Sequence, residues 1–493
     1  MSQLNEKDAD LIIVGCGIAG LSAAATAIQN GLSVTLLERA TQEDYGGNTR
    51  WTEAYMRMKS ESEVSDDFEE LFAQNIGHNI DPNVLIAVAE PYRDWPPYVK
   101  AHGLPDPELI STFSAAAGPT IAWLKEFGIK FDKMPMYLLT ISAPRIMPVG
   151  GGLAMIEALM AFVQQRGARV LYEHTAKDLI VDQRGSVRGI TARDSSGACH
   201  AFKGKAVLLA SGGFQGNPEM LARYIGRRAE YIRPVARGGY YNKGEGIRMA
   251  LAHGAAPAGD YTSYHAEPVD PRSRQPQAII MNYPYGILVN KEGQRFVNEA
   301  PGPADNNYDP ITKKIGEQPD GIAYVIYDQS MNDVPNWHRS IRSELSPIQA
   351  NTLGELAEKL AIPRDALEQT VRAFNAACTK GDFNPAEVDH LATDGLRPPK
   401  SNWARPINTG PFAAFPIVSA NCFTYGGLKI NSNAQVLDCD GRVMPGLFAA
   451  GETVGLYYQT YTGATSVLRG AVFGRIAAQT HLESLRRSEM LTS

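Results

Sequence analysis

The chain has 493 residues, of which 44% are hydrophobic, so it is long enough for two or three domains with sizeable cores. Its formal net charge is −6, with 53 acidic and 47 basic residues and no long basic run, which argues against nucleic acid as a partner. Five scattered cysteines without a CxxC pair predict no zinc site, iron–sulfur cluster or c-type haem, so no metal is expected. The N-terminal stretch MSQLNEKDADLIIVG has too short an apolar run for a signal peptide or a transmembrane segment, which indicates a cytoplasmic protein.

Residues 9–38 follow the order strand, glycine-rich turn, helix and second strand. The apolar run from Leu11 to Val14 predicts a strand buried on both faces, and it leads directly into the GxGxxG pattern GCGIAG. An alanine-rich helix follows, and the strand SVTLLE then ends at an acidic residue. Such glycines let the backbone approach a pyrophosphate at a helix N-terminus, and the acid accepts ribose hydroxyls. The pattern predicts a dinucleotide site whose first residues are Gly15, Gly17, Ile18, Ala19, Gly20, Glu38 and Arg39.

Five later segments carry a resemblance to known flavoproteins. In chain order they are GGNTR, PVGGGLAMIEALMAFVQQRGARVLYEHTAKDLIVD, KAVLLASGGFQGN, RVMPGLFAAGETVG and TYTGATSVLRGAVFG. With these segments the chain resembles the flavoprotein superfamily of fumarate reductases, succinate dehydrogenases and 3-ketosteroid dehydrogenases. The resemblance implies FAD as the cofactor. Some members link a nearby histidine to the flavin, and none lies between Gly46 and Leu71, so we expect non-covalent FAD.

The resemblance also assigns residues of these segments to the cofactor. The GGNT-like stretch runs along the FAD, the backbone near Ala176 contacts the adenine, and the serine–glycine turn closes over the dinucleotide. The N-terminus of the last helix points at the O2 and N1 region of the flavin, where negative charge accumulates on reduction. The residues implied are Gly46, Gly47, Asn48, Thr49, Arg50, Ala176, Ser211, Gly212, Gly213, Gly451, Glu452, Ser466 and Val467.

The domain organisation predicted is an α/β fold, a Rossmann-like FAD-binding domain with an inserted α+β capping domain. The FAD-binding domain is expected over residues 1–261 and 406–493, and the inserted capping or substrate domain over 262–405. Within the insertion, Thr352 and Glu355 form a capping-box pattern and Pro363 suits a helix start. In the superfamily the capping domain closes over the flavin and excludes water.

The substrate side departs from the fumarate reductases. Their carboxylate-binding arginine, twelve residues before the phenylalanine of FGR, is here Tyr461. Their NExxxRD pattern is here NEAPGPAD, which lacks the proton-donating arginine, and the histidine of HTMGG corresponds to Phe423. Tricarballylate dehydrogenases resemble the chain in CFTYGGLKI, MNYPYGILVN and TYTG, and 3-ketosteroid dehydrogenases share a TYxG-like loop. The chain is therefore not expected to be a fumarate reductase.

The residues expected to carry catalysis follow from this comparison and from side-chain chemistry. Tyr461 is expected to donate a hydrogen bond to a substrate oxygen, because a tyrosine is neutral at neutral pH. Arg145 and His265 are candidates for binding a carboxylate, the histidine because it can charge near neutrality. Tyr425 and Tyr285 are weaker candidates, since aromatic residues usually belong to the core.

The function expected is an FAD-dependent dehydrogenase that desaturates a C–C bond next to a carboxylate or ketone, resembling tricarballylate dehydrogenase. A base would take a proton while flavin N5 takes the hydride, and an external acceptor such as a quinone, a dye or a partner redox protein would reoxidise the flavin. One alternative is a 3-ketosteroid or cyclic-ketone 1,2-desaturase. Others are an electron-transfer flavoprotein subunit and an ene-reductase working in the opposite direction.

Overall fold

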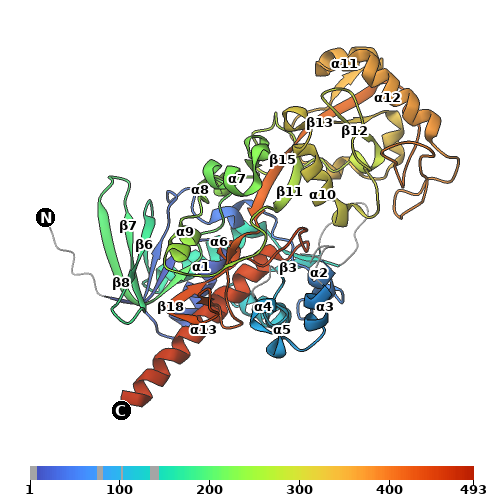
Figure 1. The fold of residues 1–493 in the computed structure, drawn as a ribbon. Coiled ribbons are helices and arrows are strands. Elements are labelled where there is room, and N and C mark those ends of the chain that lie inside the picture. The colour runs from blue at the N-terminus through green and yellow to red at the C-terminus, as the bar shows by residue number, and fades with distance from the viewer. Residues whose placement is uncertain (1–7, 75–81, 101–103, 134–143, 493) are drawn as a thin grey trace.

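The computed structural model describes residues 8–74, 82–100, 104–133 and 144–492, which form two large sheets and two small two-stranded sheets, surrounded by helices (Figure 1). One large sheet collects strands from both ends of the chain, and the other large sheet is built from the middle of the chain. The long strand between residues 412 and 424 runs from the centre of the molecule into the second of these large sheets (Figure 1).

The elements have the following bounds. The first sheet and the helices against it are β1 (Ala9–Val14), α1 (Ile18–Gln29), β2 (Val34–Leu37), α6 (Gly151–Gln165), β5 (Arg169–Leu171), β6 (Thr175–Val181), β7 (Val187–Arg193), β8 (Cys199–Leu209), β17 (Gln435–Leu437), β18 (Val443–Ala449) and α13 (Ser466–Thr492). The second sheet and its helices are β9 (Arg233–Pro234), β11 (Tyr264–Val269), β12 (Ile287–Asn290), α10 (Ala304–Gly316), β13 (Ile322–Tyr327), β14 (Ile348–Ala350), α11 (Leu353–Leu360), α12 (Arg364–Ala377) and β15 (Phe412–Thr424). The other elements are η1 (Gly47–Trp51), α2 (Phe68–Gln74), α3 (Pro82–Val88), α4 (Pro97–Lys100), α5 (Pro107–Lys125), β3 (Phe131–Lys133), β4 (Ile146–Pro148), α7 (Pro218–Ile225), α8 (Arg237–Tyr241), α9 (Glu245–Ala252), β10 (Pro257–Ala258), β16 (Gly427–Leu428) and η8 (Gly451–Thr453).

The first sheet has the strand order β17-β18-β8-β1-β2-β5, and its central neighbours from β18 to β5 are parallel. The hairpin of β6 and β7 joins the sheet through β8. Strand β1 is apolar and almost wholly buried, as a strand covered on both faces requires. The predicted α/β fold with a Rossmann-like parallel sheet is therefore confirmed, together with the strand–turn–helix–strand order of residues 9–38.

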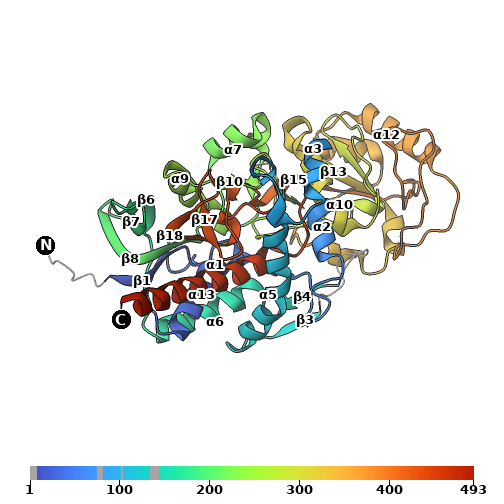
Figure 2. The same ribbon diagram turned by 60° about the horizontal axis from the view of Figure 1, so that its bottom comes forward.

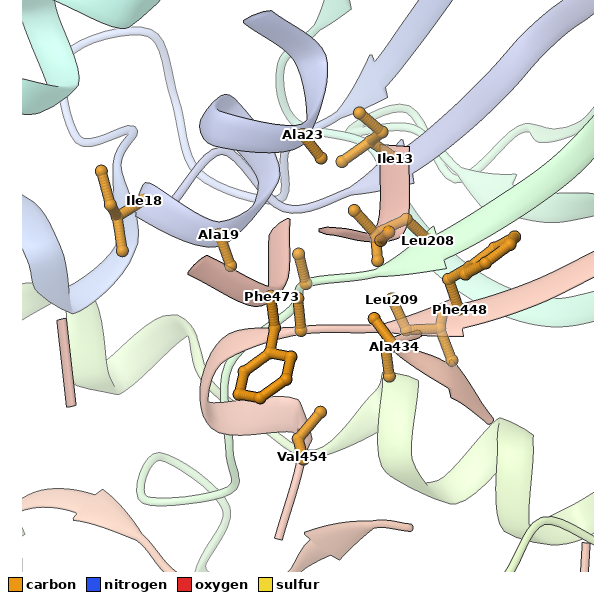
Figure 3. Packing of buried hydrophobic residues seen from close by; sticks show 14 of the residues in the cluster. Ile13, Ile18, Ala19, Ala23, Leu208, Leu209, Ala434, Phe448, Val454 and Phe473 are labelled. Atoms are coloured by element: carbon orange, nitrogen blue, oxygen red, sulfur yellow. The ribbon is translucent and has the colours of Figure 1, made fainter. Parts of the chain in front are cut away.

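Helices α1 and α13 lie side by side against this sheet (Figure 2). A Cβ atom added to Gly474 of α13 would stand 2.2 Å from the backbone oxygen of Ala19 in α1, so only glycine allows this approach. Figure 3 shows the packing beside this contact, where Ile13 and Leu208 come from neighbouring strands and Phe473 comes from α13. The small residues of both helices thus set the distance between them.

The second sheet has the order β11-β15-β13-β12, and these four strands are antiparallel neighbours, with β14 and β9 also on β15. Helix α10 packs on β11 and β15, while α11 and α12 lie at the far end of the molecule (Figure 1). The predicted cap of α11 is present, because the Thr352 hydroxyl accepts the N–H of Glu355 at 3.2 Å. Pro363 directly precedes α12, as predicted.

We propose that the second sheet and its helices form the capping domain. Strand β15 belongs to this sheet, although it begins after residue 405, where the capping domain is predicted to end. The continuous hydrogen bonding of β15 with β11 and β13 places the sheet's own limit near Thr424. Amino-acid composition alone did not predict that β15 belongs to this sheet, because long irregular stretches separate its strands.

A buried ion pair holds the motif NEAPGPAD in the second part of the chain. The Arg295 guanidinium donates from Nε to Glu299 Oε1 at 2.8 Å and from one terminal nitrogen to Oε2 at 2.6 Å. The two side chains are 4% and 0% exposed, and Glu299 Oε1 also accepts the N–H of Leu288. The glutamate of this motif therefore has a structural role here.

We predict that Glu299→Ala lowers the free energy of unfolding by about 3–5 kcal/mol, because it leaves Arg295 buried without a counter-charge. The measurement is the change in the free energy of unfolding, obtained from chemical denaturation of the part that contains the second sheet. Glu368→Ala is the control, since Glu368 pairs with Arg364 and Arg372 at the surface of α12 and should cost less than about 1 kcal/mol. Equal losses in the two variants would contradict the structural role of the buried pair.

Candidate functional site

A single cavity runs along the carboxyl ends of the parallel strands and reaches the second sheet. Its wall includes Gly15 after β1, Glu38 after β2 and Ser211 after β8. On the other side the wall includes Tyr308 from α10 and Met281. A crevice at the carboxyl ends of parallel strands is where doubly wound folds bind their ligands.

The predicted cofactor residues line this cavity with four exceptions. Those in the wall are Gly15, Gly17, Ile18, Ala19, Glu38, Arg39, Gly47, Asn48, Thr49, Ala176, Ser211, Gly212, Gly451, Glu452, Ser466 and Val467. Segments separated by hundreds of residues are thus brought to one wall. Their contacts to FAD stay predictions, but the fold places them together.

The four exceptions, Gly20, Gly46, Arg50 and Gly213, lie behind the wall. A Cβ on Gly20 would meet the backbone oxygen of Gly15 at 2.0 Å, and one on Gly46 would meet Ile156 at 2.9 Å. Arg50 lies over the ring of Tyr45, and a Cβ on Gly213 would meet Glu452 at 2.2 Å. These residues permit close packing beneath the cavity. The GxGxxG spacing alone does not separate a glycine needed for packing from one that faces a ligand.

Two facing glycines form a cradle at the N-terminus of α1. A Cβ on Gly17 would meet no protein atom closer than 3.7 Å, and one on Gly47 would lie 3.8 Å from the Cα of Gly17. Gly47 has a φ of +57°, which favours glycine. The cradle therefore leaves room for a group that approaches the backbone closely, and the helix N-terminus favours an anion there.

The remaining polar groups of this wall also fit a dinucleotide. The Glu38 carboxylate accepts N–H groups of Cys16 and Ala40, each at 2.9 Å, which orients it at the end of β2, while burial raises the pKa of Glu38. Ser211 Oγ and Asn48 Oδ1 are buried without a hydrogen-bond partner in the protein. Buried polar atoms are normally paired, so these atoms suit a polar ligand. The residues present therefore fit FAD.

Tyr461 lies in the cavity wall beside the N-terminus of α13. Its hydroxyl accepts the backbone N–H groups of Thr465 and Ser466, each at 3.0 Å. Its ring packs against His265, with ring centroids 4.3 Å apart, and against Phe423 at 5.0 Å. The hydroxyl predicted to contact the substrate, and the Ser466 N–H predicted to face the flavin, therefore bind each other in this structure.

Arg145 reaches the same end of the cavity. One terminal guanidinium nitrogen lies 3.0 Å from Asp305 Oδ2, and the two side chains are 5% and 0% exposed. Its Nε is buried without a hydrogen-bond partner. The guanidinium thus keeps an unused donor at the cavity wall, consistent with the predicted role in binding a carboxylate.

His265 lies opposite Tyr461, and its Nε2 is 2.7 Å from the hydroxyl of Tyr308. Desolvation by burial lowers the pKa of His265 to about 4. The expectation that this histidine charges near neutrality is therefore corrected: it is a neutral imidazole at neutral pH. Burial also raises the pKa of Tyr308 well above its usual value, so the pair offers neutral hydrogen-bonding groups.

Tyr425 and Tyr285 do not reach the cavity wall. The Tyr425 hydroxyl is buried and donates to Asp309 at 3.3 Å, which itself pairs with Lys313. The Tyr285 hydroxyl donates to the carbonyl oxygen of Pro385 at 2.7 Å. The structure thus places both residues outside the wall of this cavity, and their predicted contacts with the substrate stay predictions.

The sequence did not predict several residues of the cavity wall. They include Tyr308, Glu267, Cys422 and Arg469. Glu267 could have been found, because it follows His265 by two positions and shares its face of a strand. Tyr308 and Cys422 carry no local motif, and only the packing of α10 and β15 on β11 brings them to the site.

The parallel sheet, the glycine cradle and the oriented acid are typical of a dinucleotide-binding protein. Residues 10–468 match the family described as FAD binding domain, so the chain belongs to that family and its cofactor is FAD. It is 29% identical to the NADH:acrylate oxidoreductase of Vibrio harveyi, over 97% of this chain and 51% of that protein, so it spans about half of that relative's length. It is 28% identical to the urocanate reductase of Eggerthella lenta, over 95% of this chain and 74% of that protein.

Solved structures share the fold. The 3-ketosteroid-Δ4-(5α)-dehydrogenase of Rhodococcus jostii RHA1 matches with a TM-score of 0.66 and 24% identity, over 97% of this chain and 98% of that one. The family match and the named relatives identify the chain as an FAD-dependent oxidoreductase. Within the described ranges, no helix combines the length and apolar character of a membrane span.

We predict that Gly17→Ala lowers FAD content without unfolding the chain, because its Cβ would enter the cradle and meet no protein atom closer than 3.7 Å. The measurement is the ratio of flavin to protein absorbance after purification, with circular dichroism to follow the fold. Gly31→Asn is the control, since Gly31 has a positive φ, open surroundings and no place in the cavity wall. Full FAD content in Gly17→Ala would contradict the cradle.

Proposed function

We propose that this enzyme desaturates a C–C bond adjacent to a carboxylate, with FAD accepting the hydride, in the manner of a tricarballylate dehydrogenase. The observation that carries the proposal is Arg145, a buried guanidinium in the cavity wall with a donor that no protein group uses. The two relatives named above are called after acrylate and urocanate, which are both carboxylates next to a C–C double bond. When bound, FAD supplies the two-electron redox chemistry.

Arg145 has hydrogen-bond donors beyond the one that Asp305 uses. Asp305 balances the guanidinium from one side, at 3.0 Å. A guanidinium has five N–H donors in a planar fork, so a substrate carboxylate can bind those that Asp305 leaves free. Gly463 lies against the same guanidinium, since a Cβ there would be 3.1 Å from a terminal nitrogen.

The neutral pair of His265 and Tyr308 is suited to handling a proton at the other end of the substrate. Their hydrogen bond is 2.7 Å long, and the Tyr308 hydroxyl lies in the cavity wall. The chain lacks the arginine of the reductase motif NExxxRD, so this pair is the group we propose in its place for exchanging a proton with a substrate carbon. The same pair can also donate to a ketone oxygen, which makes a cyclic-ketone desaturase the second candidate.

The test is an anaerobic titration of the oxidised holoenzyme, in which loss of the visible flavin absorbance reports desaturation. Saturated polycarboxylates of the tricarballylate kind should reduce the flavin, whereas steroid and simple cyclic ketones should not. Reduction by ketones alone would assign the second candidate. Oxidation of the pre-reduced enzyme by unsaturated carboxylates, without the forward reaction, would assign an ene-reductase. Turnover of the isolated chain with a dye as external acceptor would argue against an electron-transfer subunit.

We predict that Arg145→Lys weakens carboxylate binding roughly 10- to 100-fold, because a charged hydrogen bond of about 1.5–3 kcal/mol is lost while Asp305 keeps a counter-charge. The dissociation constant from the same titration is the measurement. Arg372→Lys, at an exposed site on α12, is the control and should bind as the unaltered enzyme does. Unchanged carboxylate affinity in Arg145→Lys would exclude the proposed contact.

A further inference from the structure

Three side chains with metal-ligating atoms meet at the substrate end of the cavity. The ligand atoms of His265, Glu267 and Cys422 all lie within 4.8 Å of one another. All three residues are in the cavity wall, and none of them belongs to the predicted FAD-binding set. The cluster joins a nitrogen, an oxygen and a sulfur ligand without a CxxC motif.

The sheet explains why these residues meet. His265 and Glu267 are two positions apart on β11, so their side chains point to the same face. On the neighbouring strand β15, His265 is opposite Phe423 and Ala266 is opposite Asn421, so Cys422 has no partner in the ladder. A β-bulge of this kind re-aims the side chain of the extra residue. The irregularity thus brings the thiol beside the other two groups.

The hydrogen bonding of the cluster leaves ligand atoms free. Tyr308 engages Nε2 of His265 at 2.7 Å, whereas Nδ1 is buried without a hydrogen-bond partner. The Glu267 carboxylate and the Cys422 thiol hydrogen-bond to each other, and Glu267 Oε2 is buried without any other partner. A metal-binding histidine usually donates its other ring N–H to a fixed group, which selects the tautomer with a free lone pair. Tyr308 can serve as that group.

We propose that His265, Glu267 and Cys422 form a binding site for one zinc-class divalent cation, whose fourth coordination position opens to the cavity. Thiolate, imidazole and carboxylate together suit Zn²⁺, and three protein ligands with one open position are typical of zinc sites that bind a small molecule. An anionic oxygen in the cavity can occupy the open position. The site shares His265 with the proposed desaturation, but metal binding can be measured without any substrate.

The test is zinc binding by the purified holoenzyme, first treated with a chelator and then dialysed against buffered Zn²⁺. We expect one zinc per chain by metal analysis. Cys422→Ser, Glu267→Gln and His265→Gln should each weaken binding about tenfold or more. Cys199→Ser and Cys439→Ser remove exposed thiols, and His200→Gln removes a surface histidine paired with Asp194, so these controls should bind normally.

A second readout uses the unaltered chain and does not depend on any variant folding. Saturating Zn²⁺ should slow alkylation of Cys422, followed by mass spectrometry, and leave alkylation of the exposed Cys199 unchanged. Absence of stoichiometric zinc, equal loss of binding in the cysteine controls, or unprotected Cys422 at saturating zinc would each overturn the proposal. None of these outcomes depends on which substrate reduces the flavin.

Discussion

The close approach of α1 and α13 is the constraint on which the site depends. Gly474 has no room for a Cβ against the backbone of Ala19, so the two helices pack at a distance that larger residues would not allow. Both helices begin at the wall of the same cavity, at Ile18 and at Ser466. Two helix N-termini, from opposite ends of the chain, therefore bring their positive dipole ends to one cavity.

At the substrate end of the cavity, which holds Arg145 and His265, the charges are arranged differently. Its buried charges are balanced within the protein, as in the pair of Arg145 and Asp305. Its histidine is kept neutral because burial lowers its pKa to about 4. An incoming anion therefore finds two cations of the cavity wall, Arg145 and Arg469, each with an unpartnered Nε, and neutral hydrogen-bonding groups near them. This arrangement distinguishes a carboxylate from a hydrocarbon without placing an unpaired charge in the core.

The sequence predicted the first half of the site better than the second, for a physical reason. Glycine turns, buried strands and an acid at a strand end are local features, so Gly17 and Glu38 could be found from their neighbours along the chain, while Gly47 followed from the resemblance to flavoproteins. The substrate end is assembled by tertiary packing instead. Tyr308 comes from a helix that is far from the other wall residues in the sequence. Cys422 lies in the wall because the pairing of β11 with β15 is irregular, and hydrophobic periodicity does not predict such an irregularity. Similarly, the charge state of His265 depends on burial, which the sequence does not give.

The central claim is that FAD and a carboxylate occupy one continuous cavity. The most direct measurement is an absorbance titration of the oxidised holoenzyme with malonate, a dicarboxylate that has no C–C bond to desaturate. The account predicts a saturable change in the visible flavin bands, because an anion at Arg145 would alter the field around the flavin. An unchanged flavin spectrum, while malonate binding is detected calorimetrically, would place the carboxylate site elsewhere and contradict the account.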